Sequence, residues 1–143
     1  MLGMLKKHTV ELSPEVHGRL SNNKTPISNH KIKRCLIYGD EEYIDEAITD
    51  FYGKFQFPSK NIKSRLPGNP LHEPKVQQIV CMEVEEKVYL IWFSNQDGLH
   101  INPLYCSYLN NLNADISNEK ESFWIDDIKD PTQSYQIHSI CRW

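Results

Sequence analysis

Six carboxylates crowd into eleven consecutive positions of this chain, and residues 40–50 contain no lysine or arginine. These carboxylates are Asp40, Glu41, Glu42, Asp45, Glu46 and Asp50. Their spacing predicts that they cap a helix and cover its outer face. Such a face is either an ordinary solvated surface or a negative patch that attracts a basic protein and speeds its capture. We expect the second role, which makes these residues candidate partner-binding residues.

A second acidic group surrounds Trp124 in the C-terminal third of the chain. It consists of Glu119, Glu121, Asp126, Asp127 and Asp130. An exposed tryptophan ringed by carboxylates would be a hot spot for a basic protein, whereas a core tryptophan would have no such role. The sequence leaves both interpretations open. We include Glu121, Trp124, Asp126 and Asp127 among the predicted partner-binding residues.

The sequence supports a catalytic function less well than it supports partner binding. His17, His138 and Lys33 could be assembled by folding into an acid–base group, although scattered surface histidines are the more ordinary interpretation. The run 85–87, Glu-Glu-Lys, has an acid-x-Lys spacing that metal-dependent nucleases use, but no aspartate lies between Asp50 and Asp97 to complete a site. The familiar nucleotide, zinc-protease, hydrolase and calcium motifs are absent from the sequence. We therefore predict no catalytic residue, metal or cofactor, and keep a small nuclease or toxin as the alternative.

The charge of the chain is divided unevenly. Residues 1–34 hold seven basic and two acidic residues, a balance of +5, whereas residues 35–143 hold nine basic and seventeen acidic residues, a balance of −8. The basic segments 1–34 and 54–75, the latter with interleaved aromatics, would suit single-stranded nucleic acid. A pI near 6.1 lies far below the usual footprint of nucleic-acid binders, so we expect a protein partner instead.

The 143 residues are enough for one domain with one core, and the formal net charge is −3. The longest apolar run, residues 88–93, is far too short to span a membrane as a helix. Residues 1–7 do not have the pattern of a secretory signal, which predicts a cytoplasmic protein. The four cysteines lack metal-ligand spacing, and we interpret them as core thiols.

Secondary-structure elements must hold the candidate side chains in place. Ile44, Ala47, Ile48 and Phe51 fall at helical spacing and predict a helix over residues 41–52. Alternating apolar residues predict strands over 32–38 and 75–84, and shorter strands over 123–125 and 135–143. A run that is apolar on both faces predicts a central strand over 87–94. Asn102 and Pro103 predict the start of a second helix, because asparagine caps helices and proline favours their first position.

This order predicts an α+β domain with two main helices packed on a mostly antiparallel sheet, and a ferredoxin-like βαββαβ arrangement is the first choice. Within the single domain 1–143, we expect residues 1–30 to be a loosely structured basic extension. Residues 54–75 are expected to form a long, proline-rich basic loop with a short strand or turn near 54–57.

The chain resembles the small bacterial immunity proteins that neutralise toxins of contact-dependent growth inhibition and related secreted systems. The resemblance rests on the short start at residues 1–7, one α+β domain, the apolar strand 86–93 and the acidic clusters. It implies a non-enzymatic protein that binds a cognate, nuclease-like toxin and blocks its active site. No single residue carries a role over from that family.

Overall fold

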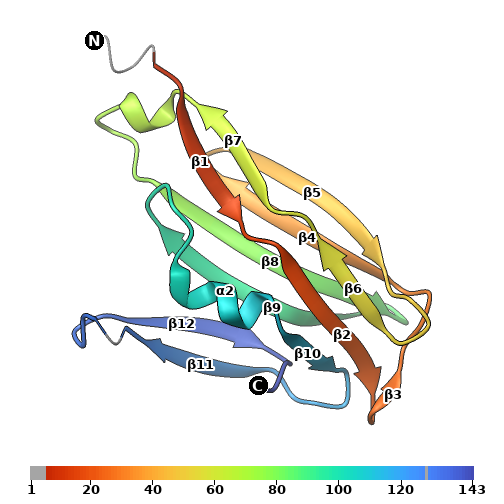
Figure 1. Cartoon of the computed structure of the whole chain (residues 1–143). Helices are drawn as coiled ribbons and strands as arrows, with labels where there is room; N and C mark the ends of the chain where they lie inside the picture. The colour runs from red at the N-terminus through yellow and green to blue at the C-terminus, as the bar shows by residue number, and fades with distance from the viewer. Residues whose placement is uncertain (1–5, 128) are drawn as a thin grey trace.

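Two layers of β-strands packed face to face form this protein, in a computed structural model that describes residues 6–127 and 129–143. One layer is a six-stranded antiparallel sheet with the order β11-β12-β9-β8-β4-β5. Its strands are β4 (Lys31–Tyr38), β5 (Glu41–Ile48), β8 (Lys75–Val84), β9 (Lys87–Asp97), β11 (Glu121–Asp126) and β12 (Ser134–Ser139). Figure 1 shows this sheet behind the N-terminal strands.

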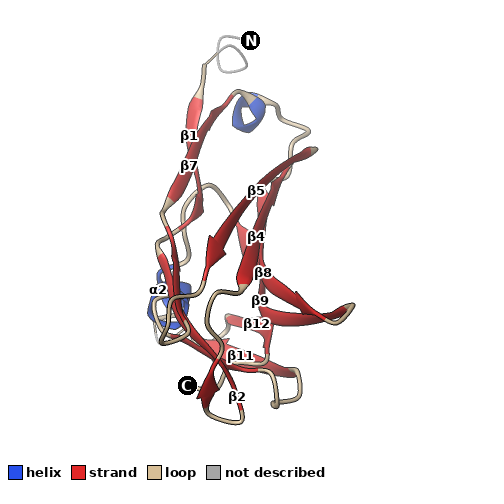
Figure 2. Ribbon diagram, turned by 90° about the vertical axis from the view of Figure 1, so that its right-hand side faces the viewer, coloured by secondary structure: helices blue, strands red, loops and turns tan. Residues whose placement is uncertain are grey.

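The other layer consists of two smaller sheets. In one of them, β1 (His8–Ser13) pairs with β7 (Lys60–Ser64). In the other, β2 (Val16–Asn22) pairs with β3 (Thr25–Pro26), β6 (Lys54–Phe57) and, in parallel, β10 (Leu112–Asp115). Figure 2 views the layers from the side, with β1 and β7 facing β4 and β5 across the core.

The predicted α+β class is wrong. Strands account for 57% of the described residues and helical residues for 7%, and these residues contain one α-helix, α2 (Pro103–Leu109). The capping prediction for α2 is confirmed, because the Asn102 side chain accepts a hydrogen bond from the Leu104 amide over 3.0 Å. A sandwich of sheets replaces the expected two helices on one sheet, and the ferredoxin-like arrangement is excluded.

The predicted helix over residues 41–52 is instead strand β5 and the loop that follows it. A two-residue turn, Gly39 and Asp40, sends the chain back along β4, with Tyr38 opposite Glu41. Gly39 has φ +58°, a conformation that glycine adopts without steric cost, and glycine at the first turn position is typical of tight hairpins. The hairpin pairing with β4 overrides the helical spacing of the apolar residues.

The two segments predicted to be irregular also form strands. Within residues 1–30, β1, β2 and β3 are ordered strands, whereas residues 1–5 lie outside the described part of the chain. Residues 54–75 contain β6, β7 and a short 3-10 helix, η1 (Leu66–Gly68). The short strand expected near residues 54–57 is confirmed as β6. The register of β2 with β6 places Phe55 and Phe57 in the core, where their burial stabilises the second layer.

The core lies between the layers and is rich in aromatic residues. Trp92 of β9 is fully buried and meets Tyr105 of α2 edge to face, with ring centroids 5.6 Å apart. The indole nitrogen of Trp92 donates to Ser94, whose hydroxyl donates to Gln78 over 2.6 Å. The Gln78 amide nitrogen in turn donates to the Leu12 carbonyl of β1 over 2.9 Å, so a buried polar chain joins the two layers.

Asp115 fixes the end of β10 against the β2–β3 turn. Its carboxylate accepts hydrogen bonds from the backbone amides of Asn23, Lys24 and Ser117 and from the hydroxyls of Ser21 and Ser117. Burial acts to raise the pKa of Asp115, but the Ser117 hydroxyl and the three amides outweigh it and hold that pKa well below its usual range. Asp115 therefore stabilises the fold in its ionised form.

All four cysteines are free thiols; Cys141 is buried and the other three are partly buried. Burial raises the pKa of the Cys141 thiol to about 12, against smaller lowering effects of Ser139 and Arg142. Among the described residues, no helix has the length and apolar character needed to cross a membrane.

Candidate protein-binding surface

The first acidic group lies on and beside β5, the last strand at one edge of the six-stranded sheet. Side chains alternate along a strand, so successive residues of β5 face opposite sides of the sheet. Glu42, Ile44, Glu46 and Ile48 are exposed on the outer side, whereas Tyr43, Asp45 and Ala47 are partly buried toward the other layer. The outer side of β5 therefore presents an alternation of acidic and apolar residues.

Exposed apolar side chains concentrate at this edge. Among the described residues, nine large hydrophobic side chains are exposed, and four of them lie within residues 44–52. The exposed fractions are 52% for Ile44, 62% for Ile48, 81% for Phe51 and 60% for Tyr52. Water-exposed apolar side chains that gather in one place and are flanked by charges are typical of protein-binding surfaces.

The loop after β5 holds its two aromatic side chains in a fixed frame. The Asp50 carboxylate accepts hydrogen bonds from the backbone amides of Tyr52 and Lys54, over 2.8 and 2.9 Å. Gly53 has φ +78°, and a side chain there would collide with the Leu20 carbonyl. The rings of Phe51 and Tyr52 meet edge to face with centroids 5.4 Å apart. A loop that is ordered before binding loses less entropy when a partner arrives.

Asp45 has an internal partner. Its carboxylate accepts two hydrogen bonds from the Arg34 guanidinium, 2.9 Å from Nε and 2.6 Å from Nη2. Arg34 is 1% exposed, and its Nη1 donates to the Pro58 carbonyl over 2.7 Å while the guanidinium lies 5.0 Å from the Phe57 ring centroid. Asp45 therefore neutralises a buried cation, and Asp50 holds a loop. These two predicted partner-binding residues have structural contacts that explain them.

The remaining acidic residues of the group are open to solvent. Asp40 lies in the β4–β5 turn, and Glu41 and Glu42 follow it. Glu46 lies 3.5 Å from Lys31, a contact between two largely exposed side chains that contributes little to stability. We call Glu42, Ile44, Glu46, Ile48, Phe51 and Tyr52 together the β5 surface.

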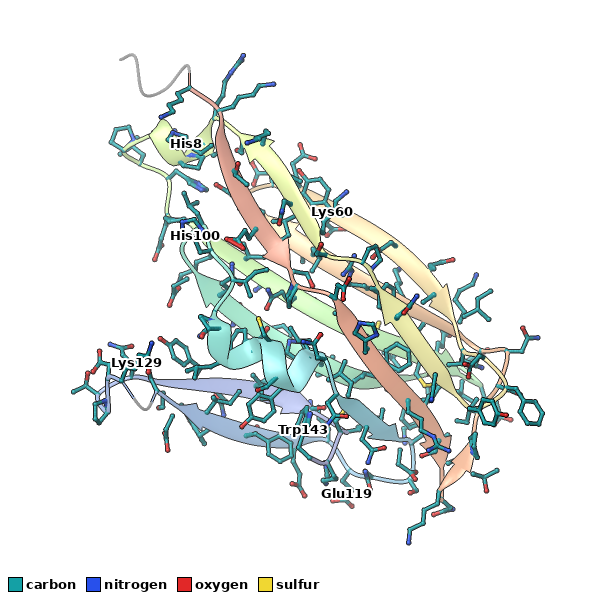
Figure 3. All side chains as sticks on the ribbon, in the orientation of Figure 1. His8, Lys60, His100, Glu119, Lys129 and Trp143 are labelled. Carbon is teal, nitrogen blue, oxygen red and sulfur yellow. The ribbon has the colours of Figure 1, made fainter. Side chains whose placement is uncertain are left out.

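Two hollows follow the same edge, where the sandwich is open between its layers. One has a volume of about 620 Å³ and lies between the end of β5 and β6, with Ala47, Ile48 and Phe55 in its lining. The other, about 280 Å³, lies beside Tyr43 and Asp45. The Lys60 ammonium of β7 lies 5.7 Å from the Tyr43 ring centroid and links the two layers at this second hollow. Figure 3 shows Lys60 on β7, on the side toward β5.

The residues of the second acidic group lie on different faces of β11 and in the loops before and after it. Trp124 is 64% exposed, which answers the question that the sequence left open, and Asp126 is exposed on the same face of β11. Glu121 precedes Phe123 and Ile125 on the other face, and its carboxylate lies 3.3 Å from the Arg142 guanidinium. The Asp127 carboxylate accepts a hydrogen bond from the Lys129 amide. Along β11, Asp126 is the acidic residue that shares the face of Trp124.

The two acidic groups do not form one site. β5 and β11 are at opposite edges of the six-stranded sheet, with β4, β8, β9 and β12 between them. The β5 surface combines four exposed apolar side chains with two exposed carboxylates, whereas the β11 edge has Trp124 and Asp126. The β5 surface is therefore the stronger candidate.

The residues of the catalytic alternative are also separated. His17 lies on β2 and His138 on β12, in different layers, and each is flanked by a residue whose side chain faces the core. His138 is hydrogen-bonded to Ser122, with Nδ1 2.8 Å from the hydroxyl, and packs against Phe93. Glu85 and Glu86 form the tip of the β8–β9 hairpin. Among the residues that the structure describes, no three histidine, cysteine or acidic side chains are grouped to hold a metal.

Sequence reasoning missed the apolar half of the β5 surface. Ile44, Ile48 and Phe51 were expected to be the buried stripe of a helix, and all three are exposed. The signal that could have found β5 is the glycine-aspartate pair at residues 39–40, which is typical of a two-residue hairpin turn.

The chain belongs to the DUF6795 family, a domain of unknown function, which matches residues 16–119. This range begins at the first residue of β2 and ends before β11. It includes the whole β5 surface and excludes Trp124 and Asp126. No curated protein matches the chain.

Proposed function

We propose that this DUF6795 chain is a non-enzymatic inhibitor, an immunity protein that binds a cognate bacterial, nuclease-like toxin and blocks its action. We further propose that the β5 surface contacts the toxin. The observation that carries the proposal is the concentration of exposed apolar side chains at this edge, among exposed carboxylates. Phe51 and Tyr52 are the expected anchors, since aromatic residues dominate the energetics of protein interfaces.

Charge supports the same partner class. Residues 40–50 contribute four exposed carboxylates besides Asp45 and Asp50, namely Asp40, Glu41, Glu42 and Glu46. A nuclease needs a positive surface to hold its phosphate-rich substrate. Opposite charges on the two proteins would steer the encounter and raise the association rate. Because salt screens exposed charges over about 8–10 Å, the association rate should fall as ionic strength rises.

Growth rescue tests the proposal directly. If a nuclease-like toxin domain is encoded beside the gene for this chain, cells that express it should grow only when the chain is co-expressed. The two purified proteins should then bind. Replacing Phe51 with Ala should weaken binding about thirtyfold, as expected for a hot spot of about 2 kcal/mol. Replacing Ile48 with Asp should weaken it further, because a new carboxylate would be buried in the interface.

Leu71 provides the matched control. It is the most exposed large hydrophobic side chain of the described residues and lies in the loop before β8. This loop packs beside the β4–β5 turn, at the opposite end of β5 from Ile48. Leu71→Asp should bind as the parent chain does. Equal losses from Leu71→Asp and Ile48→Asp, or no binding to the toxin at all, would contradict the proposal. Cleavage of RNA or DNA by the purified chain, abolished by His17→Ala or His138→Ala, would replace it with the nuclease alternative.

A further inference from the structure

We infer that β5 binds its partner by strand addition, in which an extended basic segment of the partner pairs with the free edge of β5 as a seventh strand of the sheet. This inference rests on the proposed function and specifies how the β5 surface would work. It also names the chemistry of the partner segment: basic and apolar residues alternating on one face.

The backbone of β5 has an open hydrogen-bonding edge. In an antiparallel pair, residues alternate between those bonded to the neighbouring strand and those whose N–H and C=O groups point away from it. The Thr49 amide donates to the His30 carbonyl over 2.9 Å, which fixes the alternation. Every second residue before Thr49 has the same orientation. The backbone groups of residues 47, 45, 43 and 41 are therefore the ones that form hydrogen bonds with β4. The N–H and C=O groups of residues 42, 44, 46 and 48 therefore point away from the sheet.

Within the described part of the chain, no other strand pairs with this edge and no backbone bond engages those four residues. A free edge of this length is a template for another chain, and proteins usually blunt or cover it. Here the same four residues have side chains on the exposed outer face. Backbone and side-chain recognition would thus come from one set of residues.

The side chains specify which segment would fit. Along the edge they read Glu42, Ile44, Glu46, Ile48, and directly opposed residues of paired strands interact most strongly. An added strand would place lysine or arginine opposite the two glutamates and branched apolar residues opposite the two isoleucines. Its alternate side chains would face inward, toward the hollows of about 620 and 280 Å³ on the same edge. Phe51 and Tyr52 lie three and four residues beyond the end of β5 and would contact the segment where it leaves the edge.

Two other roles for this edge are protection from aggregation and pairing with a second copy of the chain. Its residues fit a basic partner better than either role. Charges on an edge strand protect it from aggregation, but protection alone would not leave Ile44 and Ile48 exposed at two of the four outward positions. A second copy would pair β5 with β5 about a two-fold axis. The register centred on Asp45 would place Glu42 opposite Ile48 and Glu46 opposite Ile44, so neither glutamate would meet a cation. The two adjacent registers would place Glu46 opposite Glu42 or opposite itself. Like charges in direct opposition destabilise pairing, so a basic partner is preferred.

A synthetic peptide tests the inference. The probe is acetyl-Thr-Val-Thr-Lys-Thr-Val-Thr-Lys-amide, which in antiparallel pairing places its valines opposite Ile48 and Ile44 and its lysines opposite Glu46 and Glu42. It is added to the isotopically labelled full chain and followed by NMR. We expect the amides of Glu42, Ile44, Glu46 and Ile48 to shift and to exchange more slowly with solvent when the peptide binds. The amides of Tyr43 and Asp45, already bonded to β4, should change little in exchange.

Two N-methylated versions of the peptide separate strand addition from side-chain binding. Methylation of the two valine amides, which would face β5, should weaken binding about thirtyfold, because each blocked hydrogen bond contributes about 1 kcal/mol. Methylation of two threonine amides, which would face away, should change the affinity by less than about threefold. Equal affinities of both versions would overturn strand addition while leaving a protein-binding β5 surface intact.

Absence of binding by the unmodified peptide at millimolar concentration would also overturn strand addition. So would slow exchange of the same four amides caused by dimerisation without any peptide. Failure of the proposed function is a different result, namely a toxin domain that neither binds the chain nor is neutralised by it.

Discussion

Replacing Asp45 with Asn should destabilise the fold strongly, although Asp45 belongs to the acidic group that the sequence assigned to partner binding. The substitution keeps the shape of the side chain but removes the charge that neutralises Arg34, whose side chain is 1% exposed. Two charge-assisted hydrogen bonds of 2.9 and 2.6 Å would be lost or weakened. The hydrogen bonds from Arg34 to Pro58 and Ser13 would remain, but neither acceptor neutralises the guanidinium.

The magnitude follows from the burial of the two partners. Breaking a fully buried ion pair costs about 3–5 kcal/mol, because the remaining charge is left without compensation. The Asp45 side chain keeps part of its surface in water, so the low end applies and we expect a loss of about 3 kcal/mol. A domain of this size has only about 5–15 kcal/mol of stability in total.

Urea unfolding followed by tryptophan fluorescence measures the effect, because Trp92 is fully buried in the core. The matched control is Glu42→Gln on the same strand, where the carboxylate is exposed and has no internal partner among the described residues. We expect its stability to change by less than about 0.5 kcal/mol.

A change of less than about 0.5 kcal/mol for Asp45→Asn, equal to that of the control, would refute the structural role of the Arg34–Asp45 pair. A second readout separates folding from binding. At a temperature where Asp45→Asn is fully folded, it should bind the toxin as the parent chain does, because its side chain faces the core. Glu42→Gln should bind more slowly at low salt.

Three further substitutions have defined outcomes. Asp115→Asn should cost about 2 kcal/mol in urea unfolding at pH 7, since a charged acceptor of several hydrogen bonds is lost. Because folding lowers the pKa of Asp115, its contribution is complete above about pH 4 and is lost on further acidification, so the gap between Asp115→Asn and the parent chain should shrink there. Replacing Glu85 and Glu86, which have φ of 49° and 68°, with Asn and Gly should raise thermal stability by about 1 kcal/mol, because these residues adopt such angles with less strain. Gly18→Ala should cost about 2 kcal/mol or more in urea unfolding, because its new methyl group would overlap the Phe55 ring; unchanged stability in any of the three would contradict the contact invoked.

Short-range sequence patterns correctly predicted several strands and the start of the helix. Apolar alternation identified β8 and, with Arg34 as an exception, β4, and Asn102 with Pro103 identified the start of α2. The predicted helix over residues 41–52 was wrong for a physical reason. Ile44 and Ile48 satisfy the spacing of a helix and of a strand equally, and only the pairing with β4 decides between them.

The candidate site depends even more on non-local information. The sequence located the acidic residues of the first group, but strand order decides that β5 is an edge, and no local pattern encodes strand order. Asp45 could not be separated from Glu42 and Glu46 because its partner, Arg34, lies on a different strand and is buried there. Trp124 was ambiguous for the same reason, since its exposure depends on which face of β11 packs on the core.

Hydrogen–deuterium exchange of the chain with and without the purified toxin domain tests the central claim most directly. If the β5 surface binds the toxin, backbone protection on complex formation should concentrate in residues 41–52, and residues 121–127 should be unchanged. Protection confined to residues 121–127, or absent throughout the chain, would contradict the account.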